Sequence, residues 1–254
     1  MENRIAIVTG ASRLKGIGKA ICVELAKKGC DVFFTYWTSY DNQMPWGVVD
    51  NEPELIAQEV KQLGVRCEKL ELDLTEQNAI EVLFNSVTKQ LGKPSILINN
   101  ATYSAETTIN NITAEELDKH YQLNIRATTL LTIEFIKQFD FKEGGRIVNL
   151  TSGQSLGKMP NEIAYAITKS AIENLTYTLS SEIAAKGITI NAVNPGPNDT
   201  GWMDTTLKKD LIKSFPMGRT GQPADLANLI GYLISKEAEW ITGQIIHSEG
   251  GFKR

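Results

Sequence analysis

Thr9-Gly10-Ala11-Ser12-Arg13-Leu14-Lys15-Gly16-Ile17-Gly18 joins a short apolar run, Arg4–Thr9, to a stretch with helical spacing, Gly18–Lys28. Glycines at such a strand-to-helix turn allow a tight bend, a close approach of the backbone to a pyrophosphate and close packing of the helix on the strand. The first N–H groups of the helix then offer a partial positive charge to phosphates. An ordinary turn is the alternative, but its position after the first strand predicts a dinucleotide-binding turn.

Outward from this turn, short β-rich runs alternate with longer segments of helical spacing along the whole chain. Ile5–Val8 and Ile96–Ile98 are apolar without strict alternation, which is typical of strands buried on both faces. The pattern predicts one α/β domain over residues 1–254, with a doubly wound, seven-stranded parallel sheet of the Rossmann type. The predicted strands are Arg4–Thr9, Asp31–Tyr36, Arg66–Leu72, Ser95–Asn99, Arg146–Thr151, Gly187–Val193 and Gln244–His247. The predicted helices are Gly18–Lys28, Glu54–Leu63, Gln77–Gln90, Ala114–Phe139, Ala164–Ala185 and Pro223–Ile234.

The composition excludes several classes of protein. The 254 residues are 42 % hydrophobic and 22 % charged, which is typical of a globular chain rather than a disordered one. A net charge of −4 without a Lys/Arg cluster argues against a nucleic-acid partner. No apolar run approaches the ~20 residues of a membrane span, and we expect no secretory signal. Cys22, Cys30 and Cys67 are odd in number and lack C-x-x-C spacing, so we expect neither disulfides nor a metal site, and a cytoplasmic protein.

Two longer stretches, residues 38–53 and 198–216, interrupt the alternation. The first is predicted to cover the adenosine of a bound nucleotide, to contact a neighbouring subunit, or to be a solvated surface loop. The second follows the sixth strand, where open α/β sheets bind ligands. Its Leu207, Leu211 and Phe215 fall on one helical face, which predicts either a lid over the substrate or a helix packed on the body of the protein.

Tyr165 and Lys169 lie four residues apart and therefore share one face of a helix. A tyrosine that exchanges a proton with a carbonyl oxygen near neutral pH needs a pKa well below about 10. An ammonium about 4 Å away supplies stabilisation of that order at an effective dielectric of about 20. Ser152 stands upstream at the end of a predicted strand. A second copy of the spacing, Tyr232 and Lys236, has no such serine and is interpreted as a surface or packing feature.

Over nearly the whole chain these features resemble the short-chain dehydrogenase/reductase family, and within it the 3-oxoacyl-[acyl-carrier-protein] reductases most closely. The glycine turn is similar to the family's T-G-x-x-x-G-x-G fingerprint, with Leu14 and Lys15 as two extra residues. Asn99-Asn100-Ala101 resembles the N-N-A-G segment, with Thr102 in place of the glycine, and residues 191–197 resemble the P-G motif.

The resemblance implies hydride transfer between a nicotinamide and a carbonyl or alcohol group of a small molecule, without a metal. The catalytic residues of the family correspond to Asn124, Ser152, Tyr165 and Lys169, with Ser155 as an alternative serine. By this resemblance Ser152 would hydrogen-bond the substrate oxygen and Tyr165 would act as the general acid. Lys169 would hold the ribose and lower the pKa of Tyr165, and Asn124 would fix a water. The implied cofactor-binding residues are Gly10, Ser12, Arg13, Gly16, Ile17, Gly18, Tyr36, Asp73, Leu74, Asn100, Ala101, Tyr165, Lys169, Pro195, Gly196 and Thr200.

The residue after the second strand bears on the choice of nicotinamide. An acidic side chain there binds the ribose 2′-OH of NAD(H) and repels a 2′-phosphate. Tyr36 is not acidic, and Arg13 resembles the basic residue of NADP-preferring members, with Lys15 as a second cation. We therefore expect NADP(H), with NAD(H) as the alternative if Asp41 folds back over the adenosine.

The substrate is less well defined. The residues expected to line its pocket are Tyr103, Leu156, Met159, Trp202 and Met203. Members that use a carrier protein often place arginines beside the active-site mouth, whereas the comparable positions here are a glutamate and a serine, at 143 and 181. This difference weakens the carrier-protein interpretation.

Three functions stay open. The first is an NADPH-dependent reductase of a carbonyl group, such as a 3-oxoacyl thioester. The second is an alcohol or sugar dehydrogenase, and the third is a dinucleotide-binding sensor without turnover. By analogy with the family we expect a homotetramer assembled through the predicted helices Ala114–Phe139 and Ala164–Ala185 and the C-terminal end.

Overall fold

The computed structural model describes residues 4–44 and 46–254, so Pro45 of the predicted 38–53 loop lies outside the described residues. In this part of the chain seven strands form one parallel sheet in the order β3-β2-β1-β4-β5-β6-β7. This order confirms the doubly wound parallel sheet. The strands are β1 (Ile5–Val8), β2 (Asp31–Tyr36), β3 (Cys67–Glu71), β4 (Ile96–Asn99), β5 (Gly145–Leu150), β6 (Ile188–Asn194) and β7 (Ile245–His247).

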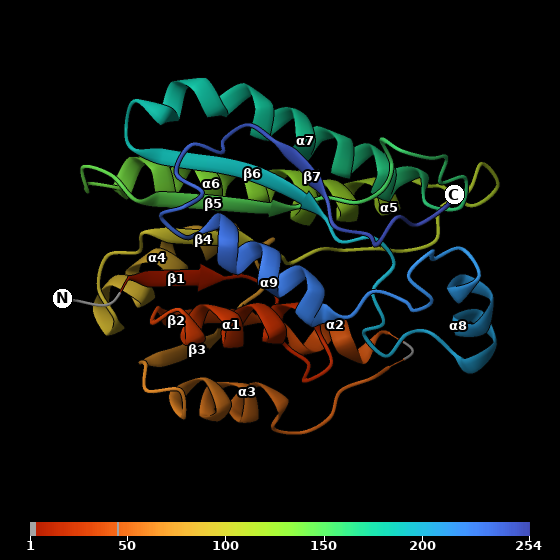
Figure 1. Ribbon diagram of the computed structural model, residues 1–254, viewed down its shortest axis with the longest axis horizontal. Helices are drawn as coiled ribbons and strands as arrows, with labels where there is room; N and C mark the ends of the chain where they lie inside the picture. The colour runs from red at the N-terminus through yellow and green to blue at the C-terminus, as the bar shows by residue number, and fades with distance from the viewer. Residues whose placement is uncertain (1–3, 45) are drawn as a thin grey trace.

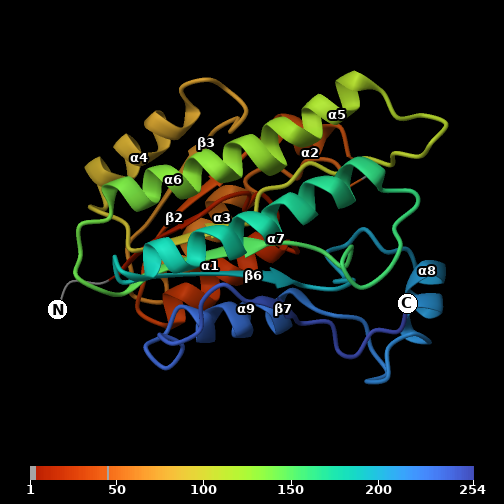
Figure 2. The same ribbon diagram turned by 90° about the horizontal axis from the view of Figure 1, so that it is seen from above.

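Helices cover both faces of the sheet (Figures 1 and 2). The helical segments are α1 (Ile17–Lys27), α2 (Thr38–Asn42), α3 (Glu52–Lys61), α4 (Ala79–Gln90), α5 (Ala114–His120), the π-helical η1 (Tyr121–Ala127), α6 (Thr128–Gln138), α7 (Ile163–Ala184), α8 (Thr205–Ile212) and α9 (Pro223–Leu233). Ala6 and Val8 of β1 face the core under α1, α3 and α9, whereas Ile5 and Ile7 face the core under α4, α6 and α7. Because both faces of the strand are buried, it shows no polar alternation.

The two interrupting stretches contain helices of their own. Within residues 38–53 the chain forms α2, and α3 begins at Glu52, two residues before the predicted start. Within residues 198–216 it forms α8, which ends at Ile212. Phe215 therefore lies beyond the helix, and its ring contacts Phe252 at 4.8 Å between centroids. The prediction that Leu207, Leu211 and Phe215 share one helical face is therefore wrong for Phe215, whereas Leu207 and Leu211 do lie on α8.

The chain after each central strand turns at one edge of the sheet. Figure 1 shows α2, α8 and the C-terminus gathered at the end towards which β1 and β6 point. The sheet order reverses between β1 and β4, which is where open α/β sheets bind ligands. No helix within the described residues has the length and apolar character needed to cross a membrane.

Candidate active site

A cavity of about 850 Å³ opens at the carboxyl edge of the sheet. The glycine turn, the ends of the central strands and the start of α7 line it together. It brings together most of the residues predicted for the site: Gly10, Ser12, Arg13, Gly16, Ile17, Gly18, Tyr36, Asp73, Leu74, Asn100, Ala101, Tyr103, Ser152, Met159, Tyr165, Pro195, Gly196, Thr200 and Trp202.

Four predicted residues do not line the cavity formed by the described residues. Asn124 and Lys169 are buried beside it. Leu156 lies in a turn after Gly153 and is 46 % exposed, outside the lining of this cavity. Met203 also lies outside the cavity lining, whereas its neighbour Trp202 is part of it.

The glycine turn has the geometry that a pyrophosphate requires. A Cβ on Gly10, whose φ is +75°, would lie 2.7 Å from Ala101 Cα, and a Cβ on Gly18 would lie 2.6 Å from the Gly10 oxygen. Within the described residues no side chain caps the N-terminus of α1, so its first N–H groups stay available to an anion. The two extra residues do not fill the turn: the Leu14 N–H donates to Glu52, and Lys15 packs against Gly201.

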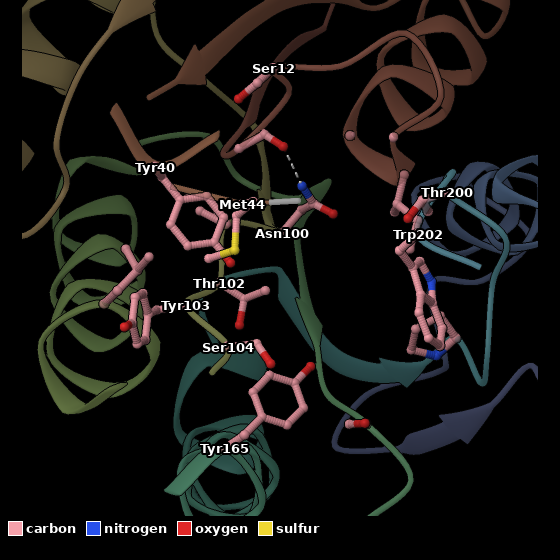
Figure 3. Close-up of a pocket in the computed structure, with 18 of the residues that line it drawn as sticks. Ser12, Tyr40, Met44, Asn100, Thr102, Tyr103, Ser104, Tyr165, Thr200 and Trp202 are labelled. Atoms are coloured by element: carbon pink, nitrogen blue, oxygen red, sulfur yellow. Dashed lines mark hydrogen bonds between the residues drawn. The ribbon is translucent and has the colours of Figure 1, made fainter. Parts of the chain in front are cut away.

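Asn100 ties the end of β4 to this turn. Its side-chain amide donates to the carbonyl oxygens of Thr9 and Gly10, both at 2.8 Å, and its backbone N–H donates to the Thr9 hydroxyl at 3.0 Å. Figure 3 shows Asn100 at the middle of the cavity, between Ser12 and Tyr165. Asn100 therefore fixes the end of β4 against the glycine turn at the centre of the cavity.

Tyr165 points into the cavity from the first turn of α7, towards Thr102 and Ser104 (Figure 3). Burial raises the pKa of its phenol above the ordinary value of 10, and the carboxylate of Glu162 raises this pKa further. The hydroxyls of Ser152 and Thr102 act in the opposite direction, because their hydrogen bonds favour the phenolate. The phenol is therefore protonated at neutral pH in this structure.

Lys169 lies on the same side of α7, and its amine bonds to the end of β5. Its ammonium donates to the Leu150 carbonyl at 2.8 Å and lies 5.4 Å from the centroid of the Tyr165 ring. Burial lowers the pKa of Lys169 to about 7. The pKa of Tyr165 in this structure is set first by burial and then by the charge of Glu162, while the Lys169 amine is bonded to the Leu150 carbonyl.

Asn124 lies in η1, where the helix widens for one turn. Its oxygen accepts from the Tyr103 N–H at 2.8 Å and from the Thr102 hydroxyl at 3.1 Å. Its amide donates to the Tyr103 carbonyl at 2.8 Å and to the Thr168 hydroxyl at 3.0 Å. These four bonds use its full capacity, so in this structure Asn124 positions the β4 loop against α7 rather than offering a site for a water.

The two candidate serines have different surroundings. Ser152 lines the cavity, whereas the Ser155 hydroxyl donates to Glu173 at 3.3 Å. The second Tyr/Lys pair is remote from this site, because Tyr232 lies on α9, is 47 % exposed and lines no part of the cavity formed by the described residues.

Residues 38–53 fold back over the glycine turn. Asp41 is buried and forms an ion pair with Arg13 at 3.7 Å, and its carboxylate accepts from the Trp46 indole N–H at 2.9 Å. The Arg13 guanidinium lies 4.2 Å from the centroid of the Trp46 ring and donates to the Thr200 carbonyl at 3.2 Å. Arg13 thus links the glycine turn, this segment and the stretch after β6.

The same segment supplies cavity residues that the sequence did not predict. Tyr40 and Met44 stand beside Tyr103 and Thr102 in Figure 3, and the Tyr40 and Tyr103 rings contact each other at 5.9 Å. The signal available in the sequence was a run of aromatic residues after a strand that ends at the ligand-binding edge. Glu162 and Arg254 were also missed, although Glu162 lies one helical turn before Tyr165.

The chain matches proteins of one family over nearly its full length. A family model described as Enoyl-(Acyl carrier protein) reductase matches residues 10–253. An uncharacterized oxidoreductase of Bacillus subtilis, YjdA, is 48 % identical over 100 % of this chain and 98 % of its own length. The 3-oxoacyl-[acyl-carrier-protein] reductase FabG of Staphylococcus epidermidis is 31 % identical over 98 % of each chain.

Solved structures agree with these matches. A short-chain dehydrogenase/reductase from Serratia marcescens superposes with a TM-score of 0.88 at 27 % identity, covering 100 % of this chain and 99 % of its own. The angucycline C-6 ketoreductase LanV, solved with bound NADP, has a TM-score of 0.86 at 28 % identity, covering 98 % of this chain and 95 % of its own. The parallel sheet, the glycine turn and these matches agree, and the chain belongs to the short-chain dehydrogenase/reductase family, whose members are NAD(P)-dependent oxidoreductases acting on CH–OH and C=O groups.

Proposed function

We propose that this protein is an NADPH-dependent reductase that transfers a hydride to the carbonyl carbon of a small ketone, aldehyde or 3-oxoacyl thioester. The observation that carries the proposal is the position of the Tyr165 and Ser152 hydroxyls in the cavity that the uncapped N-terminus of α1 also lines. An acid for the substrate oxygen and a phosphate-binding turn thus share one space.

In this mechanism Ser152 donates a hydrogen bond to the carbonyl oxygen and orients it. Tyr165, protonated at neutral pH, gives its proton to the developing alkoxide. The nicotinamide supplies the hydride when it is bound. Lys169 holds the carboxyl end of β5 against α7 and carries a partial positive charge near pH 7, while Asn124 fixes the backbone of Tyr103 in the wall. We propose these four as the catalytic set, with Asn124 in a positioning role.

The cofactor we propose is NADP(H), held by the sixteen residues named from the sequence. The last residue of β2 is Tyr36 and carries no carboxylate that would repel a 2′-phosphate. Tyr36 and Arg13 both line the cavity. The pairing of Asp41 with Arg13 offsets part of this cation's charge. We therefore propose a preference for NADPH that is moderate rather than absolute, with NADH as the weaker cofactor.

NADPH oxidation with acetoacetyl thioester and with a panel of simple ketones tests this function. Turnover of either class supports a reductase, and the ratio of the two rates separates a thioester enzyme from a general ketone reductase. Reduction of NADP⁺ with alcohols or sugars, without measurable NADPH oxidation, would favour a dehydrogenase. NADPH binding without turnover of any carbonyl or alcohol would contradict the proposal and favour the sensor.

We also propose a cytoplasmic homotetramer. The three cysteines are free and buried, which suits a reducing compartment. Helices α5 to α6 and α7 carry several exposed large apolar side chains that a subunit interface could cover. These are Leu117, Tyr121, Leu130, Ile167 and Tyr177.

A further inference from the structure

Three carboxylates line the cavity, and two of them are satisfied by the protein. Asp41 has Arg13 and Trp46 as partners, and Asp73 accepts from the N–H and the hydroxyl of Thr75 at 2.8 and 2.7 Å. Within residues 4–44 and 46–254 the carboxylate of Glu162 has neither a hydrogen-bond donor nor a cation. Only its backbone is bonded, to Met159 at 3.1 Å and Ala166 at 2.8 Å.

The position of Glu162 is fixed by the fully buried Thr107. The Thr107 N–H donates to the Asn161 carbonyl at 2.9 Å, and its own carbonyl accepts from the Ile163 N–H at 3.0 Å. The Thr107 hydroxyl accepts from the Ala164 N–H at 3.0 Å. Glu162 thus enters the cavity from a rigid point one turn before Tyr165, and its charge acts on the Tyr165 phenol.

The cations around the cavity do not neutralise this carboxylate. Arg13 is paired with Asp41, Lys119 is paired with Glu115 at 2.8 Å, and Arg254 is paired with Glu249 at 2.7 Å. Lys158 lines the cavity but forms no ion pair with a described carboxylate. Burial without a compensating charge raises the pKa of Glu162, and such a group normally costs free energy. A ligand that donates to it would remove that cost.

We propose that Glu162 recognises the substrate, by accepting a hydrogen bond from a hydroxyl or a protonated amine that lies close to the reacting carbonyl. This inference rests on the proposed reductase function and narrows its substrate to hydroxy- or amino-substituted ketones and aldehydes. The carbon skeleton of such a substrate packs against Tyr40, Met44 and Tyr103 (Figure 3). Unsubstituted ketones, and acyl thioesters without a donor near the oxo group, leave the carboxylate unpaired and react more slowly.

Matched ketones test the inference in the full-length protein with saturating NADPH. The substrates are 2-butanone, 1-hydroxy-2-butanone, 4-hydroxy-2-butanone and 1-amino-2-butanone, compared by kcat/KM. A charge-assisted hydrogen bond corresponds to a preference of about 10- to 100-fold for a donor-bearing ketone. We expect Glu162→Gln to reduce this ratio and Glu162→Leu to bring it to about one. Glu106→Gln, an exposed residue just before Thr107, is the matched control and should leave the ratio unchanged.

The relative rates of the hydroxyl and amine ketones identify the donor. The inference is overturned if the wild-type kcat/KM for the donor-bearing ketones is about the same as for 2-butanone and Glu162→Leu does not change this ratio. If 2-butanone is still reduced in that case, the proposed reductase function stands. Binding of the same four ligands to the NADP⁺ complex, measured by ligand-observed NMR, gives a readout without turnover. Tighter binding of the donor-bearing ketones that is lost in Glu162→Leu supports the role of Glu162. If no ketone is reduced in that case, only the proposed reductase function fails. Equal binding of all four ligands overturns the role of Glu162.

Discussion

Burial acts in opposite directions on the pKa values of Tyr165 and Lys169, because it penalises the phenolate of one and the ammonium of the other. The consequence for Tyr165 is a phenol that keeps its proton at neutral pH. The consequence for Lys169 is an amine with a pKa of about 7, close to neutral pH. The raised pKa keeps a proton on Tyr165 at neutral pH, but it also makes the phenol a weaker acid than a free tyrosine.

Replacing Lys169 with Met should change how stability depends on pH. The unfolded chain holds the lysine proton up to about pH 10.5, whereas the folded protein releases it near pH 7. Between these values the unfolded state binds more protons, so lysine makes the free energy of unfolding rise with pH, by about 2 kcal/mol between pH 7 and 9. Urea unfolding at both pH values should show this rise in the wild type and a smaller one in Lys169→Met. Lys158→Met is the control, and equal pH slopes in wild type and Lys169→Met would show that burial does not perturb Lys169.

At the scale of elements, the segment 38–53 is the part of the fold that the sequence pattern predicted least well. Arg13 holds the segment down through Asp41 and Trp46, and reaches across to the Thr200 carbonyl. Arg13, the side chain expected to bind a 2′-phosphate, is therefore already paired with the carboxylate of Asp41.

Asp41→Asn should strengthen the binding of NADPH more than that of NADH. The amide oxygen can still accept from the Trp46 indole, so the segment keeps this contact while Arg13 regains its full charge. The expected gain for NADPH is about three- to tenfold in Kd, in line with the modest worth of a partly exposed ion pair. Fluorescence titration with each nucleotide measures it, and Asp50→Asn, exposed in the same segment, serves as the control. An equal change for both nucleotides would contradict the role of Asp41.

Some elements could be predicted from sequence and others could not. The strands were predicted to within about two residues because a buried parallel strand leaves a continuous apolar run, as in β1. The predicted helix Ala114–Phe139 is continuous, but its π-helical turn at Asn124 depends on bonds to Tyr103 and Thr168, which are distant in sequence. The fold of residues 38–53 likewise depends on contacts with Arg13 that carry no local pattern.

At the scale of the site, residue types were predicted better than side-chain directions. The cavity contains Ser152 and Tyr165 as expected, because both follow from positions at strand and helix ends. The direction of the Lys169 ammonium depends on the Leu150 carbonyl, and the unpaired state of Glu162 depends on which cations are already engaged. Neither can be read from spacing.

At the scale of the whole molecule, the exposed apolar side chains on α5 to α6 and α7 predict assembly. Light scattering should give a mass about four times the 28.1 kDa of one chain. Leu130→Glu combined with Tyr177→Glu should lower the mass to that of a dimer or monomer, because charges are costly in a packed interface. Ile109→Glu, at an exposed position outside these helices, should leave the mass unchanged. A monomer in the wild type at micromolar concentration would remove the tetramer.

Proton donation by Tyr165 is tested by the rate of NADPH oxidation by Tyr165→Phe, measured together with the NADPH affinity of the variant. The variant lacks only the proton that the carbonyl oxygen receives, so kcat should fall by about 10²- to 10⁴-fold while the Kd for NADPH stays within about twofold. Tyr232→Phe alters the other Tyr/Lys pair, far from the cavity, and should behave as wild type. If Tyr165→Phe retains most of the wild-type turnover, Tyr165 does not donate the proton and another group must protonate the substrate oxygen.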